Sequence, residues 1–184
     1  MQQLQEQSDF DIVRQIQSGN SYAFDELMRR YKRPVVNFVY RTVGNADDAD
    51  DIAQEVFVRV YQKLDTYRFE IKLSTWLFAL AHNAAIDHLR WRARHPTESI
   101  DVVLQIEAIS TTTDEVNARE IGEGIAAAVA KLPQDQRTAL VLAEYHGLSY
   151  AEIAGVLRCS AKSVESRLYR AKQTLRKSLH QLIE

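Results

Sequence analysis

The C-terminal part of the chain carries basic and polar side chains at a spacing that could read duplex DNA. After Ser160 such residues recur every three or four positions, so at about 100° per residue they share one face of a helix. Side chains of these types bond phosphates and base edges in the DNA grooves. The members of this face are Lys162, Ser163, Ser166, Tyr169, Arg170, Gln173 and Lys177.

An ordinary solvated helix surface is the alternative interpretation of this face. Exposed helices normally mix charges of both signs, whereas Glu165 is the only acid between Arg158 and Lys177. The scarcity of acids therefore favours DNA binding. Glu165 lies at the edge of the face, where it could accept a hydrogen bond from a cytosine amino group or orient an arginine, and the sequence leaves both roles open.

An acidic cluster in the N-terminal half could bind a protein. Asp51, Gln54, Glu55 and Val58 follow an i, i+3, i+4, i+7 spacing and form one compact surface on a helix. We expect that helix to begin near Asp48 and to bury a separate stripe. Capping and solubility are the alternative role for the acids, because carboxylates are favourable at the positive end of the helix dipole. The expected buried stripe consists of Ile52, Val56, Val60 and Leu64.

A third group of residues combines aromatic rings with cations. Tyr67, Arg68, Phe69 and Lys72 form a short basic and aromatic segment, and aromatic rings beside cations suit unstacked single-stranded bases. Leu73 to Phe78 then resemble a staple and cap opening a helix that runs past Trp91. The polar residues of that helix are His82, Asn83, Asp87, His88 and Arg90.

Enzyme chemistry is disfavoured. His82 and His88 are six residues apart rather than four, so they do not share a helix face as paired metal ligands would. The sequence has no glycine-rich phosphate loop and no nucleophile elbow. We therefore expect no catalytic residues, no metal and no cofactor.

The composition favours a cytoplasmic protein. The single cysteine, Cys159, cannot form an internal disulfide. No apolar run approaches the roughly 20 residues needed to cross a bilayer, and the polar N-terminus lacks the apolar stretch of a signal peptide. We expect no insertion into a membrane.

The elements that must position these residues are all helices. Only six Gly and three Pro interrupt a chain of 184 residues, and apolar residues recur every three or four positions. We predict an all-α protein with a four-helix N-terminal domain over residues 1–94, broken at residues 18–20, 44–45 and 65–73. A polar segment, residues 95–115, is expected to be a flexible linker, and residues 116–184 a second helical domain.

The second domain has the local signals of a helix-turn-helix. Gly147 suits a left-handed position that closes the preceding helix. Ser149 with Glu152 forms a capping box, and Leu148 and Ile153 occupy the staple positions beside it. Ser160 can cap a second helix after a three-residue break, which is the helix-turn-helix interval. That helix should bury Val164, Leu168, Ala171, Leu175 and Leu179.

Five segments, in order, resemble the extracytoplasmic-function (group IV) sigma factors of bacterial RNA polymerase, in the sigma-70 family. These segments are AFDELMRRYKRPVVNFVYR, NADDADDIAQEVFVRVYQKL, STWLFALAHNAAIDHLRWR, LPQDQRTALVLAEYHGLSYAEIAGVL and SAKSVESRLYRAKQTLR. The resemblance implies a sigma-2-like domain followed by a sigma-4-like domain. It also implies a factor that binds core RNA polymerase and directs promoter recognition and melting.

The resemblance assigns roles to particular residues. Those implied to contact the polymerase β′ clamp helices are Asp51, Gln54, Glu55, Phe57, Val58 and Tyr61. The loop Thr66 to Leu73 and Asn83 match positions that hold a flipped base of the minus-ten element, and the expected minus-ten residues are Tyr67, Arg68, Phe69, Lys72, Asn83, Asp87 and Arg90. The expected minus-thirty-five residues are Lys162, Ser163, Glu165, Ser166, Arg167, Tyr169, Arg170 and Gln173.

The resemblance further implies contacts with the polymerase β flap and with an anti-sigma factor, often one anchored in a membrane. Relatives often carry lysine or arginine at the position of Glu165, so the departure leaves the promoter sequence open. A helix-turn-helix regulator that works without polymerase is the alternative function. Such a regulator would bind an operator tightly on its own, usually as a dimer.

Overall fold

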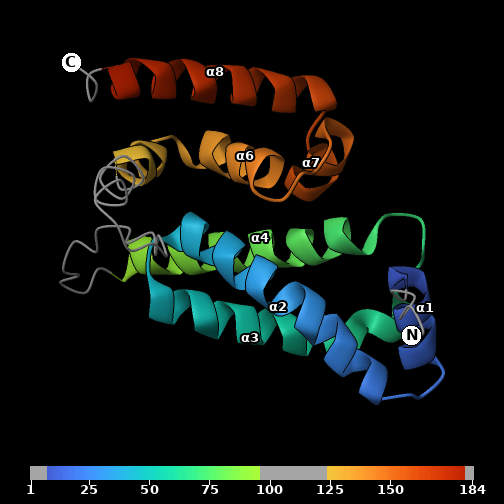
Figure 1. The fold of residues 1–184 in the computed structure, drawn as a ribbon. Coiled ribbons are helices and arrows are strands. Elements are labelled where there is room, and N and C mark those ends of the chain that lie inside the picture. The colour runs from blue at the N-terminus through green and yellow to red at the C-terminus, as the bar shows by residue number, and fades with distance from the viewer. Residues whose placement is uncertain (1–7, 96–123, 181–184) are drawn as a thin grey trace, which may run out of the picture.

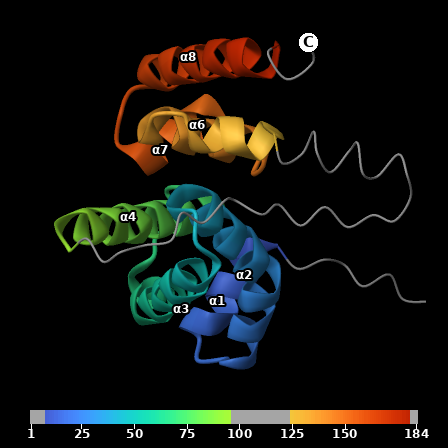
Figure 2. The ribbon, with the colours of Figure 1, turned by 90° about the vertical axis from the view of Figure 1, so that its left-hand side faces the viewer.

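The protein is built from helices throughout the part that the structure, a computed structural model, describes, namely residues 8–95 and 124–180. This confirms the all-α prediction. Figures 1 and 2 show the C-terminal helices stacked on one side of the N-terminal helices. The elements are α1 (Asp9–Gln17), α2 (Tyr22–Val43), α3 (Ala46–Lys63), the 3₁₀ turn η1 (Leu64–Thr66), α4 (Leu73–Arg94), α6 (Gln134–Glu144), α7 (Tyr150–Leu157) and α8 (Ala161–His180); residues 124–130 are also helical.

The N-terminal half packs α2, α3 and α4 around one apolar core, with α1 against α2. Phe38, Leu27 and Leu77 are fully buried in it. The predicted stripe of α3 is confirmed, because Ile52, Val56, Val60 and Leu64 are all buried. The predicted breaks between the four helices are also observed.

Both α3 and α4 start within two residues of the predicted positions. The helix α3 begins at Ala46, because the side chain of Asn45 accepts a hydrogen bond from the Asp48 backbone N–H at 2.9 Å and caps it. The helix α4 begins at Leu73, but the predicted cap is wrong, because Lys72 at the cap position makes no side-chain hydrogen bond and Ser74 lies inside the helix. The prediction that α4 runs past Trp91 is confirmed.

The C-terminal half contains the predicted helix-turn-helix. Gly147 has a φ of 64°, and the capping box joins Ser149 and Glu152 through reciprocal hydrogen bonds. Arg158 turns the chain in the left-handed region with a φ of 51°. Ser160 Oγ then accepts a hydrogen bond from the Ser163 N–H at 3.2 Å. The apolar side of α8 is held by buried Val164, Leu168 and Ala171, with Leu175 and Leu179 half-buried.

The two halves pack directly against each other, α4 against α7 and α2 against α6. The ring of His146 lies 4.5 Å from that of Phe78 and 5.9 Å from that of Phe38, measured between centroids. Arg137 Nη2 donates to the Thr42 carbonyl oxygen at 3.1 Å. Local sequence patterns gave no indication of this interface. Apart from His95, the predicted linker and the start of the second domain at residue 116 lie outside the described residues.

Candidate binding surfaces

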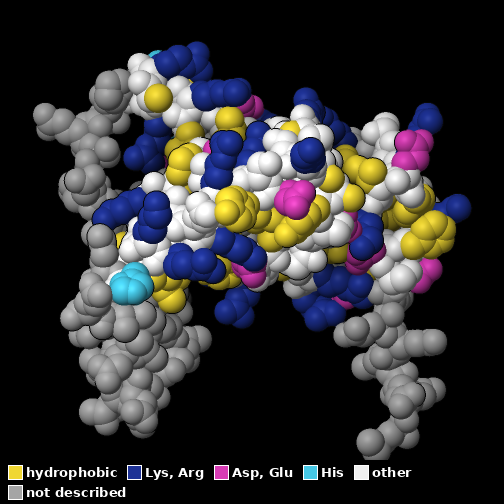
Figure 3. All heavy atoms as spheres, turned by 90° about the horizontal axis from the view of Figure 1, so that it is seen from above, with side chains coloured by type: hydrophobic (Ala, Val, Ile, Leu, Met, Phe, Trp, Pro, Cys, Tyr) yellow, Lys and Arg dark blue, Asp and Glu magenta, His cyan; other side chains and the backbone are white. Residues whose placement is uncertain are grey.

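The polar face of α8 is largely open to solvent. Lys162, Ser166, Tyr169, Arg170 and Gln173 are exposed, and Gln173 Nε2 donates to the Tyr169 hydroxyl at 2.7 Å. Figure 3 looks at the molecule from the side on which α8 lies and shows many Lys and Arg side chains across this face and few acidic ones. Because the opposite side of α8 is buried, these side chains are open to solvent, and Arg170 and Gln173 also line a surface groove with Gln136 of α6. The geometry suits insertion into a groove of duplex DNA.

Two of the predicted DNA-reading residues of α8 are half-buried rather than exposed. Arg167 is half-buried, with Nε 3.2 Å from Asp135 Oδ2 and Nη1 3.4 Å from Cys159 Sγ. The guanidinium of Arg167 thus ties α8 to α6. Ser163 is half-buried, whereas Glu165 is exposed.

The acidic face of α3 is exposed as well. Asp51, Gln54, Glu55, Val58 and Tyr61 all reach the surface, which gives a polar patch with an apolar end. Glu55 Oε1 lies 2.6 Å from Arg59 Nη2 on the same helix, and the ring of Tyr61 packs edge-on against Phe24 of α2 at 5.2 Å.

Two other residues of α3 do not belong to this patch. Phe57 is only 5 % exposed, so the structure places it in the core and not on the predicted polymerase-binding surface. The reason is its position on the helix, directly beside Val56 and three residues before Val60. Asp48 is half-buried, and its carboxylate lies 3.1 Å from His88 and 3.4 Å from Arg92 of α4.

The aromatic segment after η1 forms one wall of a cavity of about 390 Å³. Tyr67 is buried, and its hydroxyl donates to the Ile71 carbonyl oxygen, which closes the loop on itself. The rings of Phe69 and Trp76 flank the Tyr67 ring at 5.2 and 5.1 Å. The buried Tyr67 therefore stabilises the loop that forms this wall, whereas the side chains of Arg68, Phe69 and Lys72 are exposed.

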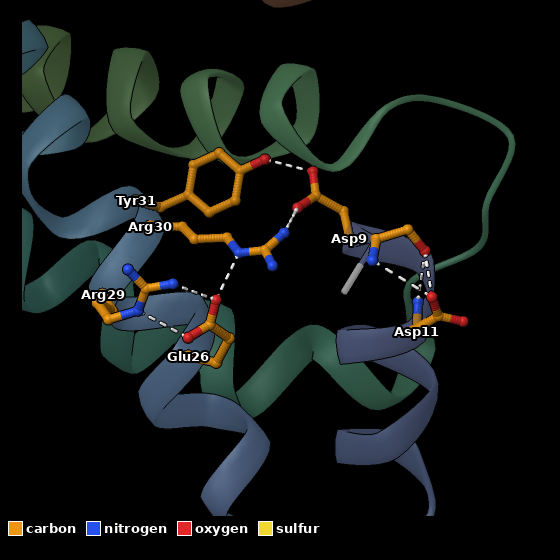
Figure 4. A network of polar contacts seen from close by, with 7 residues as sticks. Asp9, Asp11, Glu26, Arg29, Arg30 and Tyr31 are labelled. Atoms are coloured by element: carbon orange, nitrogen blue, oxygen red, sulfur yellow. Dashed lines mark hydrogen bonds and ion pairs between the residues drawn. The ribbon is translucent and has the colours of Figure 1, made fainter. Parts of the chain in front are cut away.

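The helix α1 supplies the other wall of this cavity, and sequence reasoning assigned it no role. Figure 4 shows Asp9 held by two residues of α2: Arg30 Nη1 lies 3.2 Å from its Oδ1, and the Tyr31 hydroxyl donates to its Oδ2. Burial and, as the second cause, the Asp9 carboxylate raise the pKa of Tyr31 above its ordinary value. The Tyr31 hydroxyl therefore stays protonated and acts as a hydrogen-bond donor. At the other end of α1, Gln17 Nε2 donates to the carbonyl oxygens of Leu64 and Tyr67 at 3.0 and 3.2 Å.

The predicted residues of α4 continue from the cavity toward the end of the helix. Asn83 is half-buried, and Asp87 and Arg90 are exposed, 3.7 Å apart. The neighbouring His82 has its pKa lowered to about 4, mainly by burial and then by Arg167 and Arg90. This imidazole is neutral at pH 7 and lies where α4 meets the C-terminal half.

Within residues 8–95 and 124–180, no three metal-ligating side chains gather into a site. In the same residues, no helix combines the length and apolar character needed to cross a bilayer.

Two family models match the chain, one in each half. The Sigma-70 region 2 model matches residues 27–95, and the Sigma-70 region 4 model matches residues 123–175. The first match contains the acidic face of α3 and the loop before α4, and the second contains the helix-turn-helix. The helix α1 lies outside both matches.

Full-length relatives and solved structures agree with these matches. The chain is 34% identical to the RNA polymerase sigma-H factor of Pseudomonas aeruginosa over 98% of both chains, and 33% identical to the ECF RNA polymerase sigma factor SigW of Bacillus subtilis over 92% of this chain and 96% of SigW. The fold is similar to that of CnrH, solved with the cytosolic domain of CnrY, with a TM-score of 0.70 and 26% identity over 92% of this chain and 96% of CnrH. It is also similar to that of RpoE, solved with the anti-sigma factor NepR from Bartonella quintana, with a TM-score of 0.73 and 24% identity over 85% of this chain and 96% of RpoE. The chain belongs to the extracytoplasmic-function sigma factors, which bind RNA polymerase and direct promoter recognition.

Proposed function

We propose that three surfaces of this sigma factor bind three different partners during transcription initiation. The acidic face of α3 would bind the β′ clamp helices of core RNA polymerase. The loop after η1, with Asn83, Asp87 and Arg90 of α4, would bind the melted minus-ten element. The polar face of α8 would read the minus-thirty-five element, and the C-terminal half would also contact the β flap. In this scheme the chain performs no catalytic chemistry of its own.

The observation that carries the proposal is the separation of charge between α3 and α8. The exposed acids of α3 suit a protein partner, because polyanionic DNA would repel them. The exposed cations of α8 suit DNA, and their phosphate contacts should make binding weaken steeply with salt.

Packing between the halves implies that they must part when both promoter elements are bound. The minus-ten and minus-thirty-five elements are about 25 base pairs apart, which is about 85 Å at 3.4 Å per pair. The helix α4, which carries part of the minus-ten surface, packs directly against α7, which immediately precedes α8 in the chain. We propose that core polymerase holds the halves apart, so that the first DNA contact raises the effective concentration of the second.

We also propose that an anti-sigma factor, of the kind often anchored in a membrane, restrains this chain in the cytoplasm. The support comes from two proteins of similar fold: CnrH was solved with the cytosolic domain of CnrY, and RpoE with the anti-sigma factor NepR. Co-purification of the native complex would identify both the polymerase subunits and such an inhibitor.

Run-off transcription with core polymerase tests the assignments. In a direct binding assay with core polymerase, replacing Asp51→Asn and Glu55→Gln together should weaken binding about tenfold or more. The control Asp25→Asn, at an exposed acid of α2, should leave binding unchanged. Replacing Lys162→Glu and Arg170→Glu together should abolish use of promoters that need the minus-thirty-five element. The matched change Lys32→Glu, at another exposed residue of α2, should not.

Two results would contradict the scheme. Promoter use that survives the double charge reversal on α8 would remove the reading role of that face. Core binding that survives neutralisation of Asp51 and Glu55 would remove the role of α3. A gel shift with and without core separates the sigma factor from a regulator that binds DNA alone.

A further inference from the structure

The cavity between α1 and the loop after η1 has an aromatic and cationic rim. Phe10 of α1 is 47% exposed and Phe69 of the loop 39% exposed, and their ring centroids are 4.5 Å apart. The guanidinium carbon of Arg14 lies 5.2 Å from the Phe10 centroid and 5.9 Å from the Phe69 centroid. Two large apolar rings thus stay in contact with solvent while one cation covers part of both.

The helix α1, which carries Phe10 and Arg14, is anchored by hydrogen bonds at both ends. The capping box of Ser8 and Asp11 fixes the first turn, and the bonds of Asp9 to Arg30 and Tyr31 anchor that turn to α2 (Figure 4). The bonds from Gln17 to the backbone before the loop anchor the last turn. Phe10 is therefore presented to solvent from a clamped helix, and a preorganised ring loses little entropy when it binds a ligand.

We propose that Phe10 and Arg14 form, with Phe69, a binding site for one unstacked base of single-stranded DNA and its phosphate. The base would stack on the exposed aromatic rings, an interaction that every base can make. Arg14 would donate to the phosphate, since a guanidinium that lies over a ring keeps its N–H groups free at its edge. This proposal rests on the proposed function, which places the melted minus-ten strand at the adjoining loop, and extends that surface to α1.

The charge around the cavity fits such an occupant. Asp9 lines the cavity, but both of its carboxylate oxygens are already engaged by Arg30 and Tyr31. Arg14 lies at the rim and Arg68 belongs to the loop that forms it, while Lys72, which lines the cavity, is paired with Glu152. Glu70 adds one acid that can accept from the amino group of a base. The size of the cavity, about 390 Å³, lies within the usual range of ligand pockets.

Fluorescence anisotropy of the full-length chain with labelled single-stranded hexanucleotides tests the site directly. One probe is a pool of random sequence, and the second is a hexamer of abasic sites, which has the phosphates but no bases. We expect Phe10→Leu, which keeps an apolar side chain against Phe69 but removes the flat ring, to weaken binding of the pool about fivefold or more. Phe10→Trp should retain the affinity, and Tyr22→Ala, an exposed ring at the start of α2, should not change it.

The cation is tested separately. Arg14→Gln should lower the slope of log K against log salt concentration by about 0.7 for both probes, because one phosphate contact to a single strand is lost. Thermal melting of each variant checks that α1 stays docked. Equal affinity of the native and Phe10→Leu proteins for the pool overturns the proposal, and so does native protein that binds the abasic hexamer as tightly as the pool.

Run-off transcription with the same variants separates this site from the proposed function. Native protein that supports no promoter-dependent transcription, together with hexamer binding that depends on Phe10, would refute the proposed function and leave the base site standing. Native protein that transcribes, with Phe10→Leu indistinguishable in both assays, would refute the base site alone.

Discussion

Lys72 Nζ lies 2.8 Å from Glu152 Oε1 and joins the residue before α4 to the first turn of α7. The same carboxylate accepts from the Ser149 N–H at 2.7 Å in the capping box. A residue predicted to contact the minus-ten element is thus paired with the C-terminal half while the halves are in contact. Opening of the two halves would release Lys72 for DNA.

The Lys72 and Glu152 pair should make the protein sensitive to acid. Lys72, and then Ser149, lower the pKa of Glu152 to about 2 from its ordinary 4.5. A carboxyl whose pKa is depressed by folding adds stability above its unfolded pKa, and that stability is lost as the pH falls from about 4.5 to about 2. We expect the melting temperature of Glu152→Gln to fall less across this window than that of the native chain.

The size of that effect is limited by solvent. The Lys72 side chain is 76% exposed, so at neutral pH the pair itself should contribute only about 0.2 to 1 kcal/mol. A double-mutant cycle with Lys72→Met isolates the pair from the capping bond. Glu26 also has its pKa lowered to about 2, and because it is present in every variant, its contribution cancels. A cycle with no coupling energy at neutral pH would contradict the pairing.

His146 should weaken the contact between the halves when it is protonated. Burial, and then Arg41, lower the pKa of His146 to about 4 from 6.5, so folding favours the neutral ring between Phe38 and Phe78. The stability from this ring is complete above about pH 6.5 and lost as the pH falls toward 4. We expect energy transfer between fluorophores on the two halves to fall over this range, and Phe at position 146 to reduce the change.

A second group that contributes to this response is His82, the other half-buried histidine with a pKa lowered to about 4. Since both rings lie near the interface, the double variant His146→Phe and His82→Phe should remove most of the change. A pH response that is unaltered in the double variant would assign the effect to carboxylates instead.

Arg137 should be important for stability, because it bonds parts of the chain that are far apart in sequence. Its Nη2 donates to the Thr42 carbonyl oxygen at 3.1 Å, and its Nη1 to that of Ala130 at 3.0 Å. Replacing Arg137→Met leaves both acceptors without this donor, so we expect the free energy of unfolding to fall by about 1 to 3 kcal/mol. Urea denaturation measures the loss. Arg176→Met, at an exposed residue of α8, should change stability by less than about 0.5 kcal/mol.

Two glycines should respond to alanine in opposite directions. Gly147 has a φ of 64° with nothing near its missing Cβ, so Gly147→Ala should cost about 1 to 2 kcal/mol through backbone strain alone. Gly155 lies within α7, where a Cβ would meet Thr75 Cγ2 at an ordinary 3.6 Å. Gly155→Ala should therefore stabilise the protein by up to about 1 kcal/mol through helix propensity. Thermal melting of the two variants gives the signs, and equal signs would contradict this account.

The features that the sequence predicted well are those encoded over a few residues. The capping box of Ser149 and Glu152, the cap at Ser160 and the left-handed Gly147 involve local hydrogen bonds or a single φ angle. The buried stripe of α3 follows from helical periodicity alone. These signals were sufficient to find the helix-turn-helix and both charged helix faces.

The features that the sequence could not supply depend on contacts between distant residues. Arg137 and Thr42 are separated by 95 positions, and no local pattern pairs them. Asp9 reveals its role in the cavity only once α1 is docked on Arg30 and Tyr31. Phe57 was misassigned to the surface because family resemblance gave its role, although its neighbour Val56 marks the buried side of the same helix.

The division of α8 into a buried and an exposed side has a consequence for how such genes diverge. Val164, Leu168 and Ala171 hold the helix in place, while Lys162, Ser166 and Arg170 contribute little to that packing. Substitutions at exposed sites usually cost less than about 0.5 kcal/mol. If this face reads the promoter as proposed, a copy can acquire a new set of target genes after gene duplication through a few codon changes, without first losing its ability to fold.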